Sequence, residues 1–172
     1  MNTPSLKKPN IEISVQDPEW EKMGEIYDII KLTAQTALDS ALMPKKCVGR
    51  DLEISIVLAN DDLVHVLNNT YREKDKPTNV LTFATLDDEG EIPHEGMLNL
   101  GDIVLSFQTI EREAKEQGKF PLDHIRHLTV HGVLHLLGYD HIDDDQANDM
   151  ETLEIRILEQ LGIQNPYTEM TL

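Results

Sequence analysis

Three histidines in the C-terminal half of the chain have the types and the spacing of metal ligands. His131 and His135 are four residues apart in an apolar run typical of a helix, so both side chains share one helix face, about 6 Å apart along its axis. Gly138 can adopt the left-handed conformation in which helices commonly end, which allows the chain to bring His141 back to the same point. Three neutral imidazoles leave a zinc ion one open position for water, as in catalytic sites.

The spacing His-x-x-x-His-x-x-Gly-x-x-His is that of the metzincin metalloproteases, in which a glutamate directly after the first histidine is the general base. Here that position is Gly132, which has no side chain to take a proton from water. The motif therefore predicts metal-assisted hydrolysis and excludes a peptidase mechanism that depends on this glutamate. Asp140, beside the last histidine, is a candidate for a general base, although a metal-activated hydroxide needs none.

Two further segments extend the pattern. They are Tyr71-Arg72-Glu73-Lys74-Asp75-Lys76-Pro77-Thr78-Asn79-Val80-Leu81-Thr82-Phe83 and Leu100-Gly101-Asp102-Ile103-Val104-Leu105-Ser106. With the histidine motif, they make the chain after residue 50 resemble the YbeY proteins, bacterial rRNA maturation factors described as metal-dependent endoribonucleases. The first segment matches that family's Tyr-Arg-x-Lys-Asp-x-Pro-Thr-Asp/Asn-Val-Leu-Ser-Phe signature. Thr82 replaces the usual Ser and Ala84 a common Pro, and both departures leave Arg72 and the turn intact.

The resemblance implies a catalytic role for Arg72, and the chemistry of the side chain gives a reason. A phosphodiester transition state gathers negative charge, and a planar guanidinium presents a fork of donors to phosphate oxygens. The alternative is a loop clasp in which Arg72 pairs with Glu73, Asp75 or another carboxylate.

The resemblance also implies a substrate, a metal and partners. The function it implies is cleavage of single-stranded RNA in rRNA maturation, at the 3′ end of 16S rRNA, and in ribosome quality control. We expect one zinc ion per chain, held by His131, His135 and His141, although imidazoles also suit nickel or copper. The expected partners are rRNA and the small ribosomal subunit or its proteins; neither DNA nor a membrane is expected.

Charge is the observation that fits this function least well. The formal net charge is −17, with only 15 Lys and Arg residues, whereas affinity for RNA depends on neutralising phosphates with such residues. Lys74 and Lys76 are the nearest approach to a local basic patch. Two alternatives therefore stay open. One is a non-catalytic assembly factor with a structural metal, whose acidity suits basic ribosomal proteins. The other is a metallopeptidase with a base from elsewhere in the chain.

Length and composition predict one metal-dependent hydrolase domain over residues 1–172, with 165–172 as a loose tail. A chain of 172 residues, 40% of them hydrophobic, can bury a core. It has no apolar stretch long enough to span a bilayer and its polar start does not resemble a signal peptide. The single cysteine, Cys47, excludes an internal disulfide, so a cytoplasmic location is expected.

Apolar periodicity predicts the order of the elements. We expect strands over 11–15, 52–58, from 79 onward and over 100–106. Helices are expected over 20–42, from Asn60 or Asp61 to about Asn69, from a Ser106 cap to Gln117, from Pro121 through the histidine pair, and after the acidic run 143–145. The fold class is α+β (mixed α/β), a small mixed sheet of about four strands packed with about five helices. The metal helix is expected at the centre of the core, in an architecture distantly like the zincins.

Overall fold

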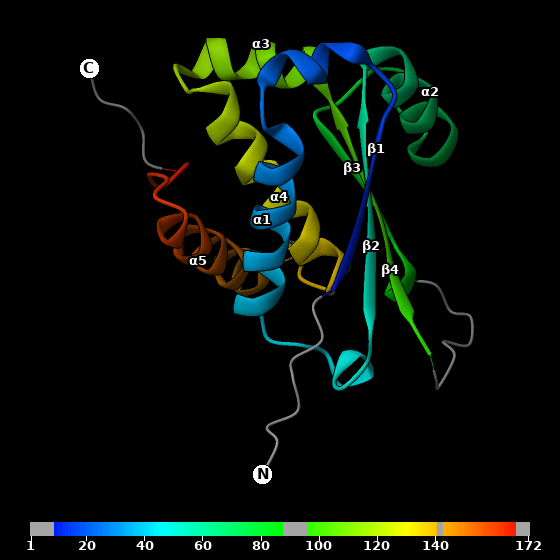
Figure 1. The fold of residues 1–172 in the computed structure, drawn as a ribbon, viewed down its shortest axis with the longest axis vertical. Coiled ribbons are helices and arrows are strands. Elements are labelled where there is room, and N and C mark those ends of the chain that lie inside the picture. The colour runs from blue at the N-terminus through cyan, green and yellow to red at the C-terminus, as the bar shows by residue number, and fades with distance from the viewer. Residues whose placement is uncertain (1–8, 88–95, 141–142, 168–172) are drawn as a thin grey trace.

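The structure, a computed structural model, describes residues 9–87, 96–140 and 143–167. In these residues four strands and five α-helices form one sheet with helices on both faces (Figure 1), which confirms the predicted fold class. In chain order the elements are β1 (Asn10–Val15), a 3-10 helix (Pro18–Met23), α1 (Ile26–Ser40), a 3-10 helix (Lys45–Cys47), β2 (Leu52–Ala59), α2 (Asp61–Arg72), β3 (Val80–Ala84), a 3-10 helix (Thr85–Asp87), β4 (Leu98–Ser106), α3 (Phe107–Gln117), α4 (Pro121–Leu136) and α5 (Asp144–Gln160).

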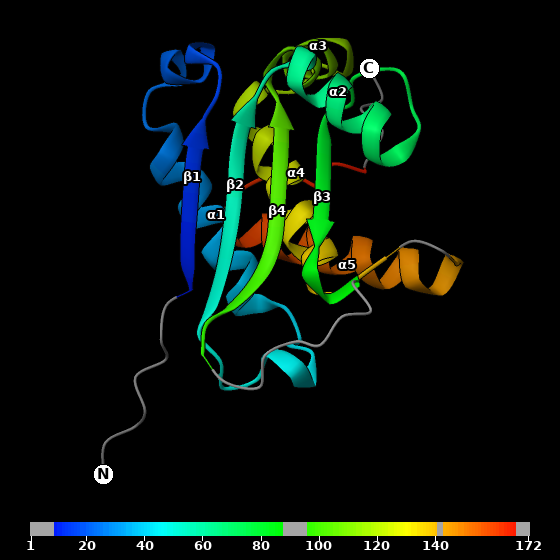
Figure 2. The same ribbon diagram turned by 90° about the vertical axis from the view of Figure 1, so that its right-hand side faces the viewer.

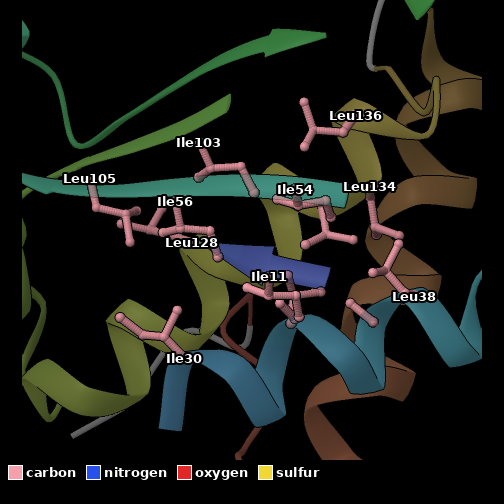
Figure 3. Close-up of a cluster of buried hydrophobic side chains, with 14 of the residues drawn as sticks. Ile11, Ile30, Leu38, Ile54, Ile56, Ile103, Leu105, Leu128, Leu134 and Leu136 are labelled. Carbon is pink, nitrogen blue, oxygen red and sulfur yellow. The ribbon is translucent and has the colours of Figure 1, made fainter. Parts of the chain in front are cut away.

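The sheet is mixed, with strand order β1-β2-β4-β3. Strands β1, β2 and β4 run parallel, and β3 lies antiparallel to β4 at one edge (Figure 2). Alternation along β2 directs Ile54, Ile56 and Leu58 into the main core, because successive side chains of a strand point to opposite faces. The helices α1 and α4 cover that face (Figure 3), while α2 covers only one end of the other face.

Helix α4 lies at the centre of the main core, as predicted. It contacts α1, α3 and α5 as well as β3 and β4. Pro121 occupies its first turn, where a missing N–H breaks no helical hydrogen bond. The chain leaves the helix at Gly138, whose φ of 100° is a conformation that other residues rarely adopt. The turn that should follow the histidine pair is therefore present.

The first helix is shorter than predicted. The apolar stripe over 20–42 belongs to a 3-10 helix and the separate helix α1, and Gly24 between them has a φ of 70° that an α-helix does not allow. Trp20 contributes to the stripe for a different reason: its side chain is fully buried and its Nε1 donates to the Ala59 carbonyl, 2.8 Å away. The spacing of apolar residues thus predicts correctly that this stretch is buried, but it does not reveal the interruption at Gly24.

Two further boundaries differ from those expected. Helix α2 runs past Asn69 to Arg72 and ends where Glu73 adopts a left-handed conformation, with φ 56°. At the start of α3, Ser106 is not a side-chain cap; its hydroxyl donates to Asp61 Oδ1 at 2.5 Å. The same carboxylate oxygen accepts from the Thr109 backbone N–H, so a residue of α2 takes the capping role.

None of the helices in the described part of the chain combines the length and the apolar character that crossing a membrane requires. The last described residues, 165–167, lie against the core: the Pro166 carbonyl accepts from Lys119 Nζ at 3.3 Å, and Tyr167 reaches α5.

Gly132 allows α4 to lie close to the sheet, which gives a test of the packing. A Cβ at Gly132 would lie 2.9 Å from Ile103 Cγ2 on β4. Overpacking of this kind costs about 1–3 kcal/mol, whereas Ala gains about 1 kcal/mol over Gly in helix propensity. The difference between the two terms leads us to expect that Gly132→Ala lowers the free energy of unfolding, measured by urea denaturation, by up to about 2 kcal/mol.

The matched control is Ile103→Ala, which removes Cγ1, Cγ2 and Cδ1, the atoms that a Cβ at Gly132 would meet. In that background Gly132→Ala should be neutral or stabilising, because the double-mutant cycle then reports only the propensity gain. An equal loss of stability in both backgrounds would contradict the close contact.

Candidate metal centre

His131 and His135 lie side by side on α4, as their spacing predicts. Their ring centroids are 4.5 Å apart with an interplanar angle of 82°, and the two Nε2 atoms approach to 2.9 Å. Both residues are partly exposed, on a helix that is otherwise mostly buried. Two ring nitrogens therefore converge on one point at the boundary between core and solvent.

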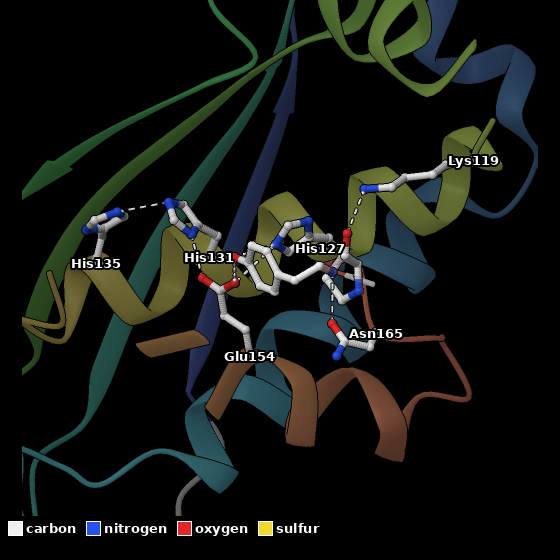
Figure 4. A network of polar contacts seen from close by, with 8 residues as sticks. Lys119, His127, His131, His135, Glu154 and Asn165 are labelled. Atoms are coloured by element: carbon white, nitrogen blue, oxygen red, sulfur yellow. Dashed lines mark hydrogen bonds and ion pairs between the residues drawn. The ribbon is translucent and has the colours of Figure 1, made fainter. Parts of the chain in front are cut away.

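A carboxylate from α5 fixes the first of these rings. Glu154 is fully buried, and its Oε1 accepts from His131 Nδ1 at 2.5 Å (Figure 4). Its other oxygen lies 3.1 Å from His127 Nε2 and accepts from the Tyr167 hydroxyl. Burying a charge is costly unless it is paired and hydrogen-bonded, and here three side chains supply the hydrogen bonds.

These contacts determine the ionisation of Glu154. Burial by itself would raise the pKa of this carboxyl, but hydrogen bonds from His127, His131 and the Tyr167 hydroxyl lower the pKa to about 2. At neutral pH the group is therefore an anion that only accepts hydrogen bonds. Burial, and then the hydrogen bond to Glu154, raise the pKa of Tyr167, so its phenol stays protonated and donates.

The anionic carboxylate selects the tautomer of His131. Because Glu154 accepts at Nδ1, that nitrogen of His131 carries the proton, and Nε2 presents its lone pair toward His135. Ligating histidines in metal sites almost always donate their second ring N–H to a carboxylate, a carbonyl or a water in this way. The arrangement thus fits a metal ion on the Nε2 side of His131.

His127 occupies the next turn of the same row. Its Nε2 contacts Glu154 and lies 3.3 Å from the Tyr167 hydroxyl, so His127 is a hydrogen-bonded neighbour of the carboxylate that holds His131. The ligand atoms of His127, His131 and Glu154 all lie within 4.8 Å of one another. The described residues therefore contain a largely buried His–His–Glu group that can bind a metal ion.

The predicted third ligand, His141, lies outside the described residues, as does residue 142. The described chain leads toward it: the Gly138 N–H donates to the His135 carbonyl and the Tyr139 N–H to the Leu134 carbonyl, each at 3.0 Å. Asp140 is the last described residue before the gap. On the far side of the gap, Asp143 Oδ1 accepts from the Gln146 N–H at 2.8 Å, so this carboxylate caps α5.

Gly132 faces the sheet and not the histidine pair. The position of its missing Cβ is occupied by the Ile103 side chain. A longer residue here would therefore have to displace the Ile103 side chain. At the position of the metzincin general base this chain has a glycine, and the Ile103 side chain lies where a longer side chain would begin.

Arg72 lies at the end of α2 and binds the edge of the sheet. One guanidinium nitrogen donates to the Thr82 carbonyl on β3 at 2.8 Å, and the group lies 5.2 Å from the centroid of the Phe83 ring. The alternative of a loop clasp is not observed: among the described residues no ion pair includes Arg72, and Asp75 pairs with His65 at 2.7 Å. The guanidinium is exposed, and the strand that holds it packs against α4.

Glu154 and Tyr167 are the functional residues that sequence reasoning missed. Glu154 interrupts the stripe of apolar residues on α5 that comprises Met150, Leu153, Ile157, Leu158 and Leu161. A carboxylate in the middle of such a stripe indicates a buried, paired charge, and that signal was available. Tyr167 lies after the last helix and carries no comparable signal.

Comparisons with known proteins identify a family to which this chain is similar. The family model described as "Endoribonuclease YbeY" matches residues 15–162. The chain is 48% identical over 162 residues to an Endoribonuclease YbeY of Paramagnetospirillum magneticum, with 92% of this chain and 96% of the relative covered. It is 45% identical over 172 residues to an Endoribonuclease YbeY of Rhizorhabdus wittichii, with 91% and 96% covered.

A solved structure is also similar in fold. The solution structure of a Thermotoga maritima protein superposes with a TM-score of 0.53 at 19% identity, covering 92% of this chain and 99% of that one. Because the family model spans most of the sequence and relatives more than 40% identical cover nearly its full length, the chain belongs to the endoribonuclease YbeY family.

Proposed function

We propose that this protein is a metal-dependent endoribonuclease that cuts single-stranded RNA during rRNA maturation, with the 3′ end of 16S rRNA as its site of action. The observation that carries the proposal is the family match over residues 15–162. The converging His131 and His135 nitrogens support the same reaction class, because metal-assisted hydrolysis needs no nucleophilic side chain. Its expected partners are the small ribosomal subunit and its proteins, in the cytoplasm.

His131, His135 and His141 are the proposed ligands of one zinc ion per chain. Imidazole nitrogens suit zinc, and a site with three protein ligands keeps a position for water. In this assignment Glu154 is not a ligand, because both of its oxygens already accept hydrogen bonds from side chains. It acts by holding the proton on His131 Nδ1, which keeps Nε2 available.

The chain's own residues then have distinct tasks in the reaction. When bound, the ion supplies electrophilic chemistry: it polarises the phosphodiester and makes water more acidic. Arg72 binds the phosphate oxygens and stabilises the charge that gathers there in the transition state. Residue 132 is glycine and supplies no base, so the proton of an attacking water would pass to solvent or to another side chain, for which Asp140 is the candidate.

Removal of single histidines distinguishes the two possible ligand sets. We expect His131→Ala and His135→Ala to lose bound metal and RNA cleavage together, because each removes one imidazole ligand. His127→Ala should keep its metal, because His127 only supports Glu154. Metal content by mass spectrometry and cleavage of a defined single-stranded rRNA precursor are the readouts. If His127→Ala loses the metal while His135→Ala retains it, the ion is bound instead by the His127, His131 and Glu154 group.

Glu154→Gln tests the orienting carboxylate. The substitution keeps the shape but removes the charge that selects the His131 tautomer, and loss of such a partner weakens metal affinity about 10- to 100-fold. Affinity is measured by competition with a chelating dye, and thermal unfolding of the metal-free protein reports on the fold. Glu159→Gln, at an exposed position of the same helix, is the control and should bind metal as the wild type does. Unchanged affinity in Glu154→Gln would contradict the orienting role.

Arg72 is tested by separating kcat from KM. Loss of one transition-state donor typically costs about 100-fold or more in kcat, so we expect Arg72→Ala to lose that factor while its metal content stays normal. Arg72→Lys should recover only part of the rate, because an ammonium lacks the planar fork. Lys74→Ala, which removes a neighbouring cation, serves as the control and should change KM more than kcat. A wild-type kcat in Arg72→Ala would remove this residue from the catalytic machinery.

A further inference from the structure

An exposed tyrosine lies directly beside Arg72 in the last turn of α2. Tyr71 is 60% exposed, so much of its ring is accessible from solvent. Its ring packs edge-on against Phe83, with centroids 5.4 Å apart and an interplanar angle of 74°. The Arg72 guanidinium lies over the same Phe83 ring. Phe83 therefore supports an aromatic ring and a cation that both face solvent.

Two lysines complete this surface, which we call the Tyr71 platform and define as Tyr71, Arg72, Lys74, Lys76 and Phe83. The stretch from Tyr71 to Lys76 carries three cations and two carboxylates, a local excess of one positive charge in a chain with a net charge of −17. One of those carboxylates, Asp75, pairs with His65. Lys74 and Lys76 are both exposed.

The platform is held in place by its own helix. Asn68 is 2% exposed, and its side-chain amide donates to the Lys76 carbonyl at 2.8 Å. The Lys74 N–H donates to the Asn68 carbonyl at 3.2 Å, and the His65–Asp75 contact ties the loop to α2 a second time. A surface with fixed geometry loses less conformational entropy when it binds a ligand.

The platform is also placed for the reaction. Leu81 and Phe83 point to the α2 face of β3, while Val80 and Ala84 pack into the main core on the α4 face. Strand β3 forms the edge of the sheet and contacts α4, so only this strand separates the platform from the helix that carries His131 and His135 (Figure 2). A flexible strand of nucleic acid that crosses this edge meets both.

We propose that Tyr71 stacks on an unpaired base of single-stranded RNA and thereby positions the strand, while Arg72, Lys74 and Lys76 contact its backbone. The inference rests on the proposed function and names how that site holds its substrate. Unstacked bases bind well to aromatic side chains, and every base offers a π-face, so such a contact favours single strands without requiring a sequence. It adds affinity that the overall charge of the protein does not supply.

The test is RNA binding by the metal-loaded protein, measured by fluorescence anisotropy with a labelled single-stranded oligonucleotide whose integrity is checked after each titration. Stacking on one aromatic residue changes affinity roughly 5- to 150-fold, so Tyr71→Ala should weaken binding within that range. Tyr71→Phe and Tyr71→Trp should bind nearly as the wild type does. Tyr71→Leu keeps an apolar contact with Phe83 without a π-face, and we expect it to bind as weakly as Tyr71→Ala.

Val66→Ala is the matched control, because Val66 is 61% exposed on the same helix and lies outside the platform. It should bind RNA normally, and a duplex of the same sequence should bind equally to the wild type and to Tyr71→Ala. In cleavage assays Tyr71→Ala should raise KM and leave kcat unchanged. Wild-type RNA affinity in Tyr71→Leu, or equal losses in Tyr71→Leu and Val66→Ala, would overturn the inference.

The outcomes for the two proposals differ. If the wild type cuts RNA and Tyr71→Leu binds and cuts equally well, the proposed function stands and the stacking contact is wrong. If the wild type binds single strands through Tyr71 but does not cut them, the stacking contact stands and the endoribonuclease assignment is wrong.

Discussion

The contact between Glu154 and His131 fixes the orientation and the tautomer of the first histidine of the pair. A carboxylate buried between α4 and α5 must be paired, and the protein pairs it with two neighbouring histidines of α4 and with Tyr167, which follows α5. The same contact places the proton on His131 Nδ1 and directs Nε2 toward His135. One interaction therefore joins the last helix to the core and sets the chemical state of a proposed ligand. The site depends on packing in a way that the histidine motif alone does not reveal.

Gly132 provides the complementary constraint on the other side of the helix. Adjacent helical residues are about 100° apart around the axis. The contact of Gly132 with Ile103 therefore also fixes the direction in which His131 points. With no side chain at residue 132, α4 approaches the sheet until Ile103 fills the space. The histidine pair is then held at the edge of the core, partly exposed to solvent. Glycine at residue 132 thus removes the metzincin-type glutamate and also allows the close packing of α4 on the sheet.

The sequence predicted what local rules control and missed what tertiary contacts control. The four strands, the helix that starts at Pro121 and the turn at Gly138 follow from periodicity and from proline and glycine chemistry. The prediction of one long first helix was wrong because an apolar stripe indicates which residues are buried. The stripe continues past Gly24, where the helical conformation is interrupted. The prediction that the Ser106 side chain caps α3 was wrong because Asp61, which is distant in sequence, accepts hydrogen bonds from both the Ser106 hydroxyl and the Thr109 N–H. Glu154 was missed, although a single charge within the apolar stripe of α5 indicates a buried, paired group.

The strong acidity of the chain is compatible with an RNA substrate once distance is considered. At physiological ionic strength, charges separated by more than about 8 Å are largely screened from one another in solvent. The charge of −17 therefore slows the approach of RNA more than it weakens contacts already made. Within that distance of the substrate, local groups such as Arg72, Lys74 and the Tyr71 ring dominate. If the two proposals hold, such an enzyme would bind RNA where the cations and the aromatic ring of the Tyr71 platform lie, and its acidic surface would disfavour binding elsewhere.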